Sequence, residues 1–336
     1  MSPTLVPIVP IRGRGNLNYP PSLGIHPRII EISLPKYPVN GRSSSKKLRD
    51  LFYSGHTDYM CENLWLNDQW PEEYANKIGN FLTKNGFKSE NGHAPKLKIV
   101  EIHPPLKGNL DDYSKFLEYV KVFEGVLRKY VSYEFEILLE NRNEEQGREN
   151  INEEEGDVSL VATSEDFVKL DRVIKENKNA GSFIDLGFII DFPQLFESEG
   201  LTFRHDPDSS HNKKWFGIDS KTYYEKIEKI FSNLYEVRSN IKEIHLWGKC
   251  AKAKASQQPH SGGLNSYFAG SPCDDRHRND ISEEKLSMKN DFLDRLYNLL
   301  DDGRKRYFLP ELTFGDEKDL VSIVKDLQDK KFIFEN

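Results

Sequence analysis

The feature that most constrains the fold is a regular alternation of apolar strand-like runs and amphipathic helix-like stretches. Continuous apolar runs predict strands at 28–35, 96–103, 133–140, 182–191, within 241–249 and at 306–312. Helical spacing of apolar residues predicts helices at 71–82, 111–130, 164–174, 220–239, 284–301 and 316–327. Strand–helix alternation with continuous apolar strands is typical of a parallel sheet covered by helices.

The number of strand–helix units favours an α/β fold of the closed (β/α)8 TIM-barrel type over an open, doubly wound sheet. A chain of 336 residues can form one such domain. No glycine-rich phosphate loop follows any of the strands, which disfavours a nucleotide-binding sheet. We therefore expect an irregular N-terminal segment at 1–28 and a single TIM-barrel domain at 29–336.

Several segments do not fit the alternation clearly. The stretch 51–70 fits either a strand or a loop. Ser164 is the expected N-cap of the helix at 164–174. Long loops on the C-terminal face are expected at 141–157, 192–219 and 248–285. Loops of that length in a compact domain are usually lids, binding loops or disordered segments.

Charge and cysteine content exclude several classes of protein. A net charge of −7 gives no reason to expect a general binder of polyanions. The 3 cysteines form no CxxC pair and no complete disulfide framework, so a reducing, cytoplasmic location is expected. The first residues lack the pattern of a signal peptide, and no run of 18 apolar residues predicts a membrane partner. The sequence allows either a monomer or an oligomer.

One polar residue of a metal-binding type ends each of several strands. They are Glu140, Asp191, His245 and Glu311, and His103 ends a further strand. The strands of a parallel barrel all end on one face, which holds the active site. Buried carboxylates are costly unless they are paired or bound to a cation. The set predicts a site for Mn²⁺, Mg²⁺ or Co²⁺, or for Zn²⁺ or Fe²⁺ if more histidines join it.

Each of these residues also has a structural interpretation. A single Glu after a strand is commonly a helix cap or an ion-pair partner, and Asp191 before Phe-Pro can simply form a turn. His245 alone can be a buried histidine bonded to a backbone carbonyl. Lys249 fits a solvated charge run as well as a phosphate contact, and His260 lies beside a glycine pair that can be a turn.

The ordered strand-end motifs resemble the xylose-isomerase-like barrel superfamily, which includes sugar isomerases, ketose 3-epimerases and the endonuclease IV type of abasic-site nuclease. The resemblance covers about residues 29–330. It depends on the order of six short motifs, which are Val100-Glu101-Ile102-His103-Pro104, Leu138-Leu139-Glu140-Asn141, Ile189-Ile190-Asp191, Ile244-His245-Leu246, His260-Ser261-Gly262-Gly263 and Pro310-Glu311.

The resemblance implies a divalent-metal-dependent isomerase or epimerase that acts on a sugar or sugar phosphate. Glu140, Asp191, His245 and Glu311 would bind the metal, and the two glutamates would move a proton through an enediolate. Implied substrate contacts are His103, Gln194, Trp247, Lys249 and His260, with Phe192 beside Trp247 against the sugar.

Two alternatives stay open. The nuclease branch would act on nucleic acid with three metals, but Gln194 stands where that pattern needs a histidine, so a trinuclear cluster is not expected. A catalytically inactive barrel that serves as a binding module is the other alternative, because Gln194 and the long loops depart from the usual members.

Overall fold

The computed structural model describes most of the chain. The described ranges are 2–12, 15–34, 52–57, 70–87, 95–107, 110–131, 134–142, 159–181, 185–204, 215–248, 250–251, 257–258, 262–269, 281–312 and 317–336. The chain divides into two compact units. Unit 1 comprises Met1–Pro27 and Ile190–Asn336, and unit 2 comprises Arg28–Ile189.

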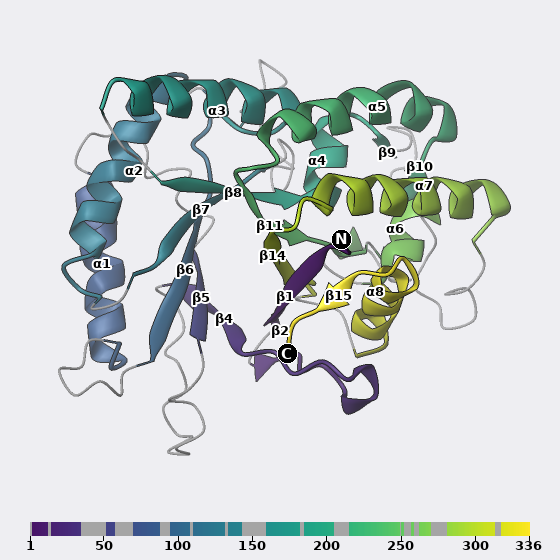
Figure 1. Ribbon diagram of the computed structural model, residues 1–336, viewed down its shortest axis with the longest axis horizontal. Helices are drawn as coiled ribbons and strands as arrows, with labels where there is room; N and C mark the ends of the chain where they lie inside the picture. Colours follow the sequence, from purple (N-terminus) through teal and green to yellow (C-terminus); the bar gives the residue numbers. More distant parts are fainter. Residues whose placement is uncertain are drawn as a thin grey trace. The chain divides into compact units, whose positions relative to one another are not determined.

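The described part of unit 2 consists of parallel strands and α-helices (Figure 1). Its strands are β4 (Ile29–Leu34), β5 (Phe52–Thr57), β6 (Lys96–Ile102), β7 (Glu136–Glu140) and the first part of β8 (Leu186–Asp191). Its helices are α1 (Trp70–Lys84), α2 (Tyr113–Leu127) and α3 (Ser164–Asn179). Each strand pairs in parallel with the next one in the chain, so their C-terminal ends lie at one edge.

Unit 1 holds the remaining elements. Its strands are β1 (Thr4–Val9), β2 (Ile11–Arg12), β3 (Gly15–Asn16), β9 (Thr202–Arg204), β10 (Trp215–Ile218), β11 (Ile241–His245), β12 (Cys250–Ala251), β13 (Gln257–Gln258), β14 (Lys305–Leu309) and β15 (Ile333–Phe334). Its helices are η1 (Pro21–Leu23), α4 (Phe192–Ser198), α5 (Ser220–Val237), α6 (Leu264–Ala269), α7 (Glu283–Leu300) and α8 (Glu317–Asp329). Strand β14 pairs in parallel with both β1 and β11.

The strand order confirms the predicted fold class. Among the described residues, the main sheet has the order β14-β11-β8-β7-β6-β5-β4-β1-β15, and β14 pairs again with β1. Without the short β15, this is a cyclic order of eight parallel strands, and eight α-helices accompany them. The chain therefore has the (β/α)8 barrel topology.

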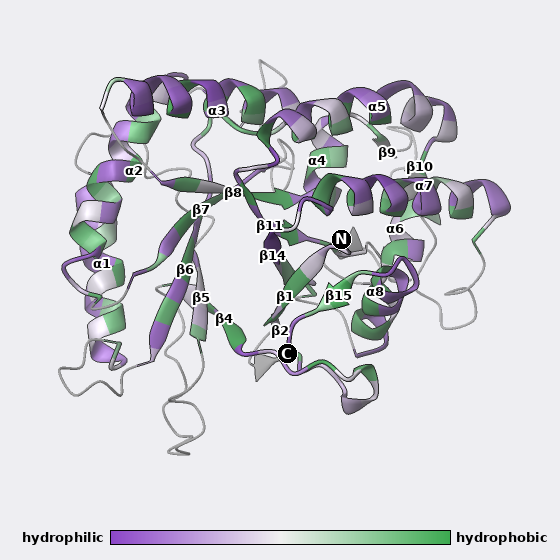
Figure 2. Ribbon diagram, in the orientation of Figure 1, coloured by the Kyte–Doolittle hydropathy of each residue, from purple (hydrophilic) through white to green (hydrophobic). Residues whose placement is uncertain are grey.

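Several helices begin at a residue whose side chain accepts hydrogen bonds from the free N–H groups of the first turn. The N-cap of α3 is Thr163, one residue before the expected Ser164, because Thr163 and Asp166 form a reciprocal capping box. The side chains of Asp112, Asp219 and Ser282 cap α2, α5 and α7 by accepting backbone N–H groups of the first turn. Figure 2 shows hydrophilic and hydrophobic residues mixed along α5 and α7, as expected for helices with one buried face.

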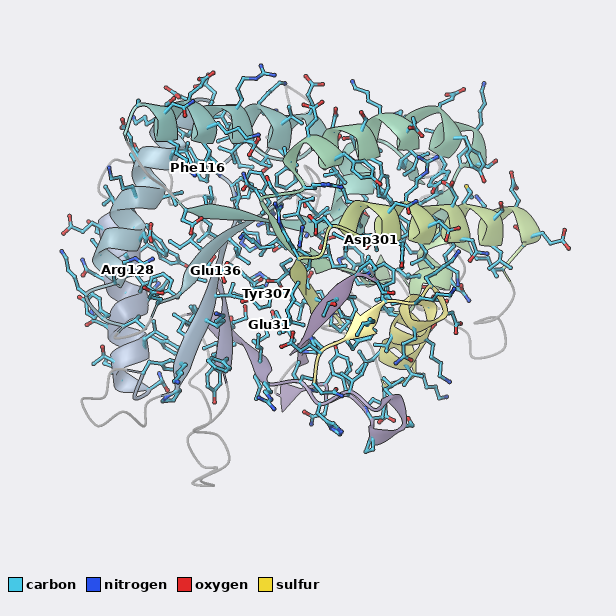
Figure 3. All side chains as sticks on the ribbon, in the orientation of Figure 1. Glu31, Phe116, Arg128, Glu136, Asp301 and Tyr307 are labelled. Carbon is cyan, nitrogen blue, oxygen red and sulfur yellow. The ribbon has the colours of Figure 1, made fainter. Side chains whose placement is uncertain are left out.

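Side chains on α2 illustrate that division. Phe116 is fully buried, whereas Arg128 just after the helix forms an ion pair with Glu124 at 2.5 Å (Figure 3). The neighbouring helix α1 approaches this end of α2 closely, and a Cβ on Gly79 would lie 2.2 Å from the ring of Tyr130. Only glycine allows that approach without displacing the ring.

The structure corrects the sequence analysis at four segments. Residues 1–28 contain the strand β1, which was not expected because prolines interrupt this segment. The ambiguous stretch 51–70 contains the strand β5. The expected loop 192–219 begins with the helix α4, and 248–285 contains the helix α6. Both helices are too short for a clear helical period. Of the expected loop 141–157, only Asn141 and Arg142 are described.

No helix in the described ranges combines the length and apolar character needed to cross a membrane.

An aromatic cluster forms the core beneath α4 and α7 in unit 1. The ring of Phe292 lies 5.2 Å from that of Phe192, 5.3 Å from Phe196, 5.8 Å from Phe268 and 6.3 Å from Phe231. These are edge or tilted arrangements that stabilise beyond the area that the rings bury. Phe192 is therefore a buried residue of this cluster, and its contact with a sugar stays a prediction.

Replacing Phe292 with Ala is expected to lower the free energy of unfolding by about 3–5 kcal/mol, because the cavity left behind cannot collapse fully. Urea denaturation of the purified variant measures this. Tyr224→Ala is the matched control, since that side chain is 51% exposed, and should change stability by less than about 0.5 kcal/mol. Equal effects of the two substitutions would contradict the central place of Phe292 in the core.

Candidate metal centres

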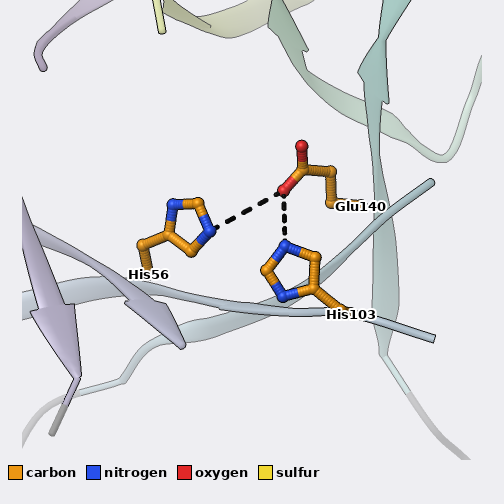
Figure 4. Close-up of side chains that lie close together, drawn as sticks. All are labelled: His56, His103 and Glu140. Carbon is orange, nitrogen blue, oxygen red and sulfur yellow. Dashed lines mark ion pairs between the residues drawn. The ribbon is translucent and has the colours of Figure 1, made fainter. Parts of the chain in front are cut away.

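Three ligand-type side chains meet in unit 2 where β5, β6 and β7 end (Figure 4). The Nε2 atom of His103 lies 3.1 Å from Oε2 of Glu140, and Nε2 of His56 lies 4.0 Å from the same oxygen. All three residues are buried, with 8% exposure for His56 and 1% for the others. The two imidazole rings are 5.0 Å apart.

The spacing of these atoms fits one shared ion. Nitrogen and oxygen ligands lie about 2.0–2.2 Å from Zn²⁺, so two ligands of one ion are at most about 4.4 Å apart. The measured 3.1 and 4.0 Å satisfy that limit. Two imidazoles and one carboxylate are also a donor set that binds first-row divalent metals. The group His56, His103 and Glu140 can therefore hold a metal ion.

Two further carboxylates surround His56. Its Nδ1 atom is hydrogen-bonded to Oε1 of Glu31 at 3.0 Å and lies 3.8 Å from Oε2 of Glu101. Glu101 is fully buried and accepts a hydrogen bond from the hydroxyl of Ser54. The strand register explains the arrangement, because His56 is paired with Glu101 on β6 and Glu31 on β4 is paired with Ser54.

The two histidines differ in protonation. Burial by itself lowers the pKa of His56, but the hydrogen bond to Glu31 and the charges of Glu101 and Glu140 outweigh it and raise that pKa to about 10. Burial lowers the pKa of His103, and the hydrogen bond to Glu140 only partly opposes the shift. His103 is therefore a neutral imidazole at pH 7, which is the form that binds metals.

A second ligand group lies in unit 1 at the ends of β8, β11 and β14. Asp191, His245 and Glu311 each offer one ligand atom, and these atoms lie within 4.8 Å of one another. The Nδ1 atom of His245 lies 3.7 Å from Oε2 of Glu311, which again fits ligands of one ion. The Nε2 atom of His245 is hydrogen-bonded to Oε1 of Glu243 at 3.1 Å.

Asp191 is held by its neighbours in a fixed orientation. Its Oδ2 atom accepts hydrogen bonds from Nε1 of Trp247 at 2.8 Å and from Nε2 of Gln194 at 3.0 Å. Its Oδ1 atom accepts the backbone N–H of Gln194 at 2.9 Å, so Asp191 is also the N-cap of α4. Gln194, which stands where the family pattern has a histidine, thus orients the Asp191 carboxylate.

Replacing Trp247 with Phe is expected to destabilise the chain by about 1.5–3 kcal/mol, because a hydrogen bond to a charged acceptor is lost inside the protein. Trp247 is fully buried, so water does not replace the lost donor. Thermal or urea unfolding measures the change. A variant as stable as the wild type would contradict the role of the indole N–H in holding Asp191.

The structure brings the predicted residues together in two sets. Glu140 lies with His103 in unit 2, and Asp191, His245 and Glu311 lie together in unit 1. The prediction that Glu140 shares an ion with those three stays a prediction, as do the substrate contacts. Lys249 and His260 lie outside the described residues. Gly262, which belongs to the His260 motif, accepts a hydrogen bond from the N–H of Gly248 at 2.9 Å.

The sequence analysis did not single out His56 as a ligand, nor the neighbouring carboxylates Glu31, Glu101 and Glu243. One signal was present, since His56 ends its strand as His103 and Glu140 end theirs. The run Phe52–Thr57 contains Ser, Gly and His, so it lacks the apolar character of the other strands. The other three are acidic residues inside strands, where only the register shows which histidine they face.

These observations define the class of protein: a (β/α)8 barrel with buried groups of metal-ligand type at its strand ends. No family model matches the chain, and no curated protein matches its sequence.

A search of solved structures found chains with a similar fold, and three of them are described here. SacUVDE is 11% identical with a TM-score of 0.45, over 98% of this chain and 100% of that one. The 3-keto-D-glucoside 4-epimerase YcjR from E. coli is 11% identical with a TM-score of 0.45, over 96% of this chain and 98% of that one. An L-ribulose 3-epimerase is 8% identical with a TM-score of 0.42, over 93% and 84%.

The (β/α)8 topology of the chain is the fold that the resemblance of the strand-end motifs implies.

Proposed function

We propose that this chain is a divalent-metal-dependent hydrolase of phosphodiester bonds. The observation that carries the proposal is the group His56, His103 and Glu140 in unit 2, in addition to the acid-rich group Asp191, His245 and Glu311 in unit 1. A single-metal isomerase needs only one such group. Divalent ions in enzymes that cleave phosphodiesters stabilise the attacking and leaving oxygens.

The donor atoms of each group support the assignment of metals. His103 is neutral and presents Nε2 beside the Glu140 carboxylate, and two imidazoles in one group favour Zn²⁺ or Mn²⁺. The group in unit 1 has two carboxylates and one imidazole, which suits Mn²⁺, Mg²⁺ or Zn²⁺. When bound, divalent ions supply positive charge that stabilises the transition state of phosphodiester cleavage.

The protein residues hold this arrangement and exclude water from it. The six ligand-type residues are 0–8% exposed, so the charges act at low dielectric, where electrostatic stabilisation is strong. Trp247 and Gln194 fix the Asp191 carboxylate, and Glu31 and Glu243 bond the histidines. The net charge of −7 indicates that attraction for a phosphate comes from the site and not from the whole surface.

The second candidate is the isomerase or epimerase acting on a sugar or sugar phosphate. The specific observation that favours it is the pairing of Asp191, His245 and Glu311 in one group, which matches three of the four positions that the motif resemblance implies. In that case Glu140 is the fourth ligand, and His56 and His103 have no ligand role.

Metal stoichiometry and substrate together test the proposal. Purified apo-protein is loaded with Mn²⁺ or Zn²⁺, bound ions are counted, and cleavage of bis(p-nitrophenyl) phosphate and of an abasic DNA duplex is assayed. The hydrolase is expected to hold two ions and His103→Ala to hold one. One ion in the wild type, with turnover of a ketose and no phosphodiester cleavage, would replace the hydrolase with the isomerase.

A further inference from the structure

Each unit contains a histidine whose two ring nitrogens face two different carboxylates. In unit 2, Nδ1 of His56 bonds Glu31 at 3.0 Å, while Nε2 faces Glu140 at 4.0 Å. In unit 1, Nε2 of His245 bonds Glu243 at 3.1 Å, while Nδ1 faces Glu311 at 3.7 Å. In both cases, the shorter contact is with a carboxylate outside the group His56, His103 and Glu140 or the group Asp191, His245 and Glu311.

The strands fix the two non-ligand carboxylates rigidly. Glu31 is paired across β4 and β5 with Ser54, two residues from His56, so both side chains stand on one face of the sheet. Glu243 and His245 are two residues apart on β11 and share a face for the same reason. Glu31 is 4% exposed and Glu243 is fully buried.

A hydrogen bond at one ring nitrogen decides which nitrogen can bind a metal. An imidazole that donates its N–H to a carboxylate has its lone pair on the other nitrogen, and the carboxylate increases the basicity of the ring. The pairing therefore assigns opposite nitrogens to the two histidines. His56 can bind only through Nε2 and His245 only through Nδ1.

We propose that Glu31 and Glu243 are positioning residues for the two candidate metal sites, which fix His56 as an Nε2 ligand and His245 as an Nδ1 ligand. The inference rests on the proposed metal function and deepens it. Neither glutamate was singled out by the strand-end pattern. Each acts through its histidine and stands outside the group His56, His103 and Glu140 or the group Asp191, His245 and Glu311.

Metal affinity of matched variants tests the two roles. Glu31→Gln and Glu243→Gln keep the side-chain size and remove the charged acceptor. Each variant is titrated with Zn²⁺ against a competing chelator, with no substrate present. Loss of such an outer partner costs about 10–100-fold in metal affinity. Glu31→Gln is expected to weaken the ion of unit 2, and Glu243→Gln the ion of unit 1.

Two controls separate orientation from charge. Glu101→Gln removes a charge that lies 3.8 Å from the same His56 nitrogen but leaves the bond to Glu31 in place. It is expected to weaken zinc affinity less than Glu31→Gln does. Glu236→Gln alters an exposed residue of unit 1 and is expected to change nothing. An effect of Glu101→Gln as large as that of Glu31→Gln would overturn positioning by the hydrogen bond.

The nitrogen assignment is read directly from ¹⁵N NMR of histidine-labelled, zinc-loaded protein, with His56→Gln and His245→Gln to assign the signals. We expect the metal shift at Nε2 of His56 and at Nδ1 of His245. Binding through the same nitrogen in both histidines would overturn the assignment. Zinc affinity unchanged in both glutamate variants would overturn the positioning roles alone. A wild type that takes up no metal would overturn these roles and the proposed function together.

Discussion

Glu140→Gln is expected to abolish metal-dependent turnover and to leave the chain folded. Glu140 is 1% exposed and lies 3.1 Å from His103, so an amide of the same size keeps the packing but loses the negative charge. Outer partners of metal sites already cost about 10–100-fold, and a direct ligand should cost at least that much. Cleavage of bis(p-nitrophenyl) phosphate with saturating Mn²⁺ measures the loss.

Glu136→Gln is the matched control for this substitution, because Glu136 begins the strand that Glu140 ends. It should keep wild-type turnover. Circular dichroism and urea melts of both variants separate loss of the site from loss of the fold. In the wild type, a chelator should remove activity and added metal should restore it. Near-wild-type turnover of Glu140→Gln would remove Glu140 from the ligand set.

Stability of the metal-free chain is expected to fall as the pH rises above about 6.5. The pKa of His56 is raised from 6.5 to about 10 in the folded chain by Glu31, Glu101 and Glu140 against the opposing effect of burial. Between those values the folded state binds the proton and the unfolded state does not. The stabilisation is therefore complete below pH 6.5 and is lost through pH 10, by up to about 1.4 kcal/mol for each pH unit.

The slope of unfolding free energy against pH is the quantity to measure, by urea denaturation of metal-free protein. His56→Gln should flatten the slope, whatever it does to the absolute stability. His26→Gln, at an exposed position, is the control substitution. Parallel curves for wild type and His56→Gln would contradict the raised pKa. Metal uptake in the same pH range should release a proton, since the ion replaces it on the ring.

The fold could be predicted largely from local pattern. The runs that became β6, β7, β8, β11 and β14 are apolar because both faces of a parallel strand are buried, and that signal is visible without tertiary structure. Two strands escaped detection. β1 is interrupted by Pro7, and β5 contains Ser54, Gly55 and His56, so neither is a continuous run of strand-forming residues. The tertiary structure overrides those propensities by pairing each strand with its neighbours.

The candidate site was predicted in part for the same reason. Strand-end residues share one edge of a parallel sheet, so Asp191, His245 and Glu311 could be grouped from their order alone. His103 and Glu140 were also found this way. His56 was not found, because its strand β5 was not recognised. The predicted ligand group of unit 2 therefore lacked one of its three residues.

The sequence by itself determined the barrel topology and the identity of most strand-end residues, because both follow from the period and the ends of apolar runs. Only the tertiary structure decided how these residues are paired. The contact between Glu31 and His56 depends on strand register. The contacts of the two His245 ring nitrogens with Glu243 and Glu311 depend on which face of the sheet each side chain occupies. Those quantities arise from hydrogen bonding between strands that are distant in the chain, which no local pattern of residues records.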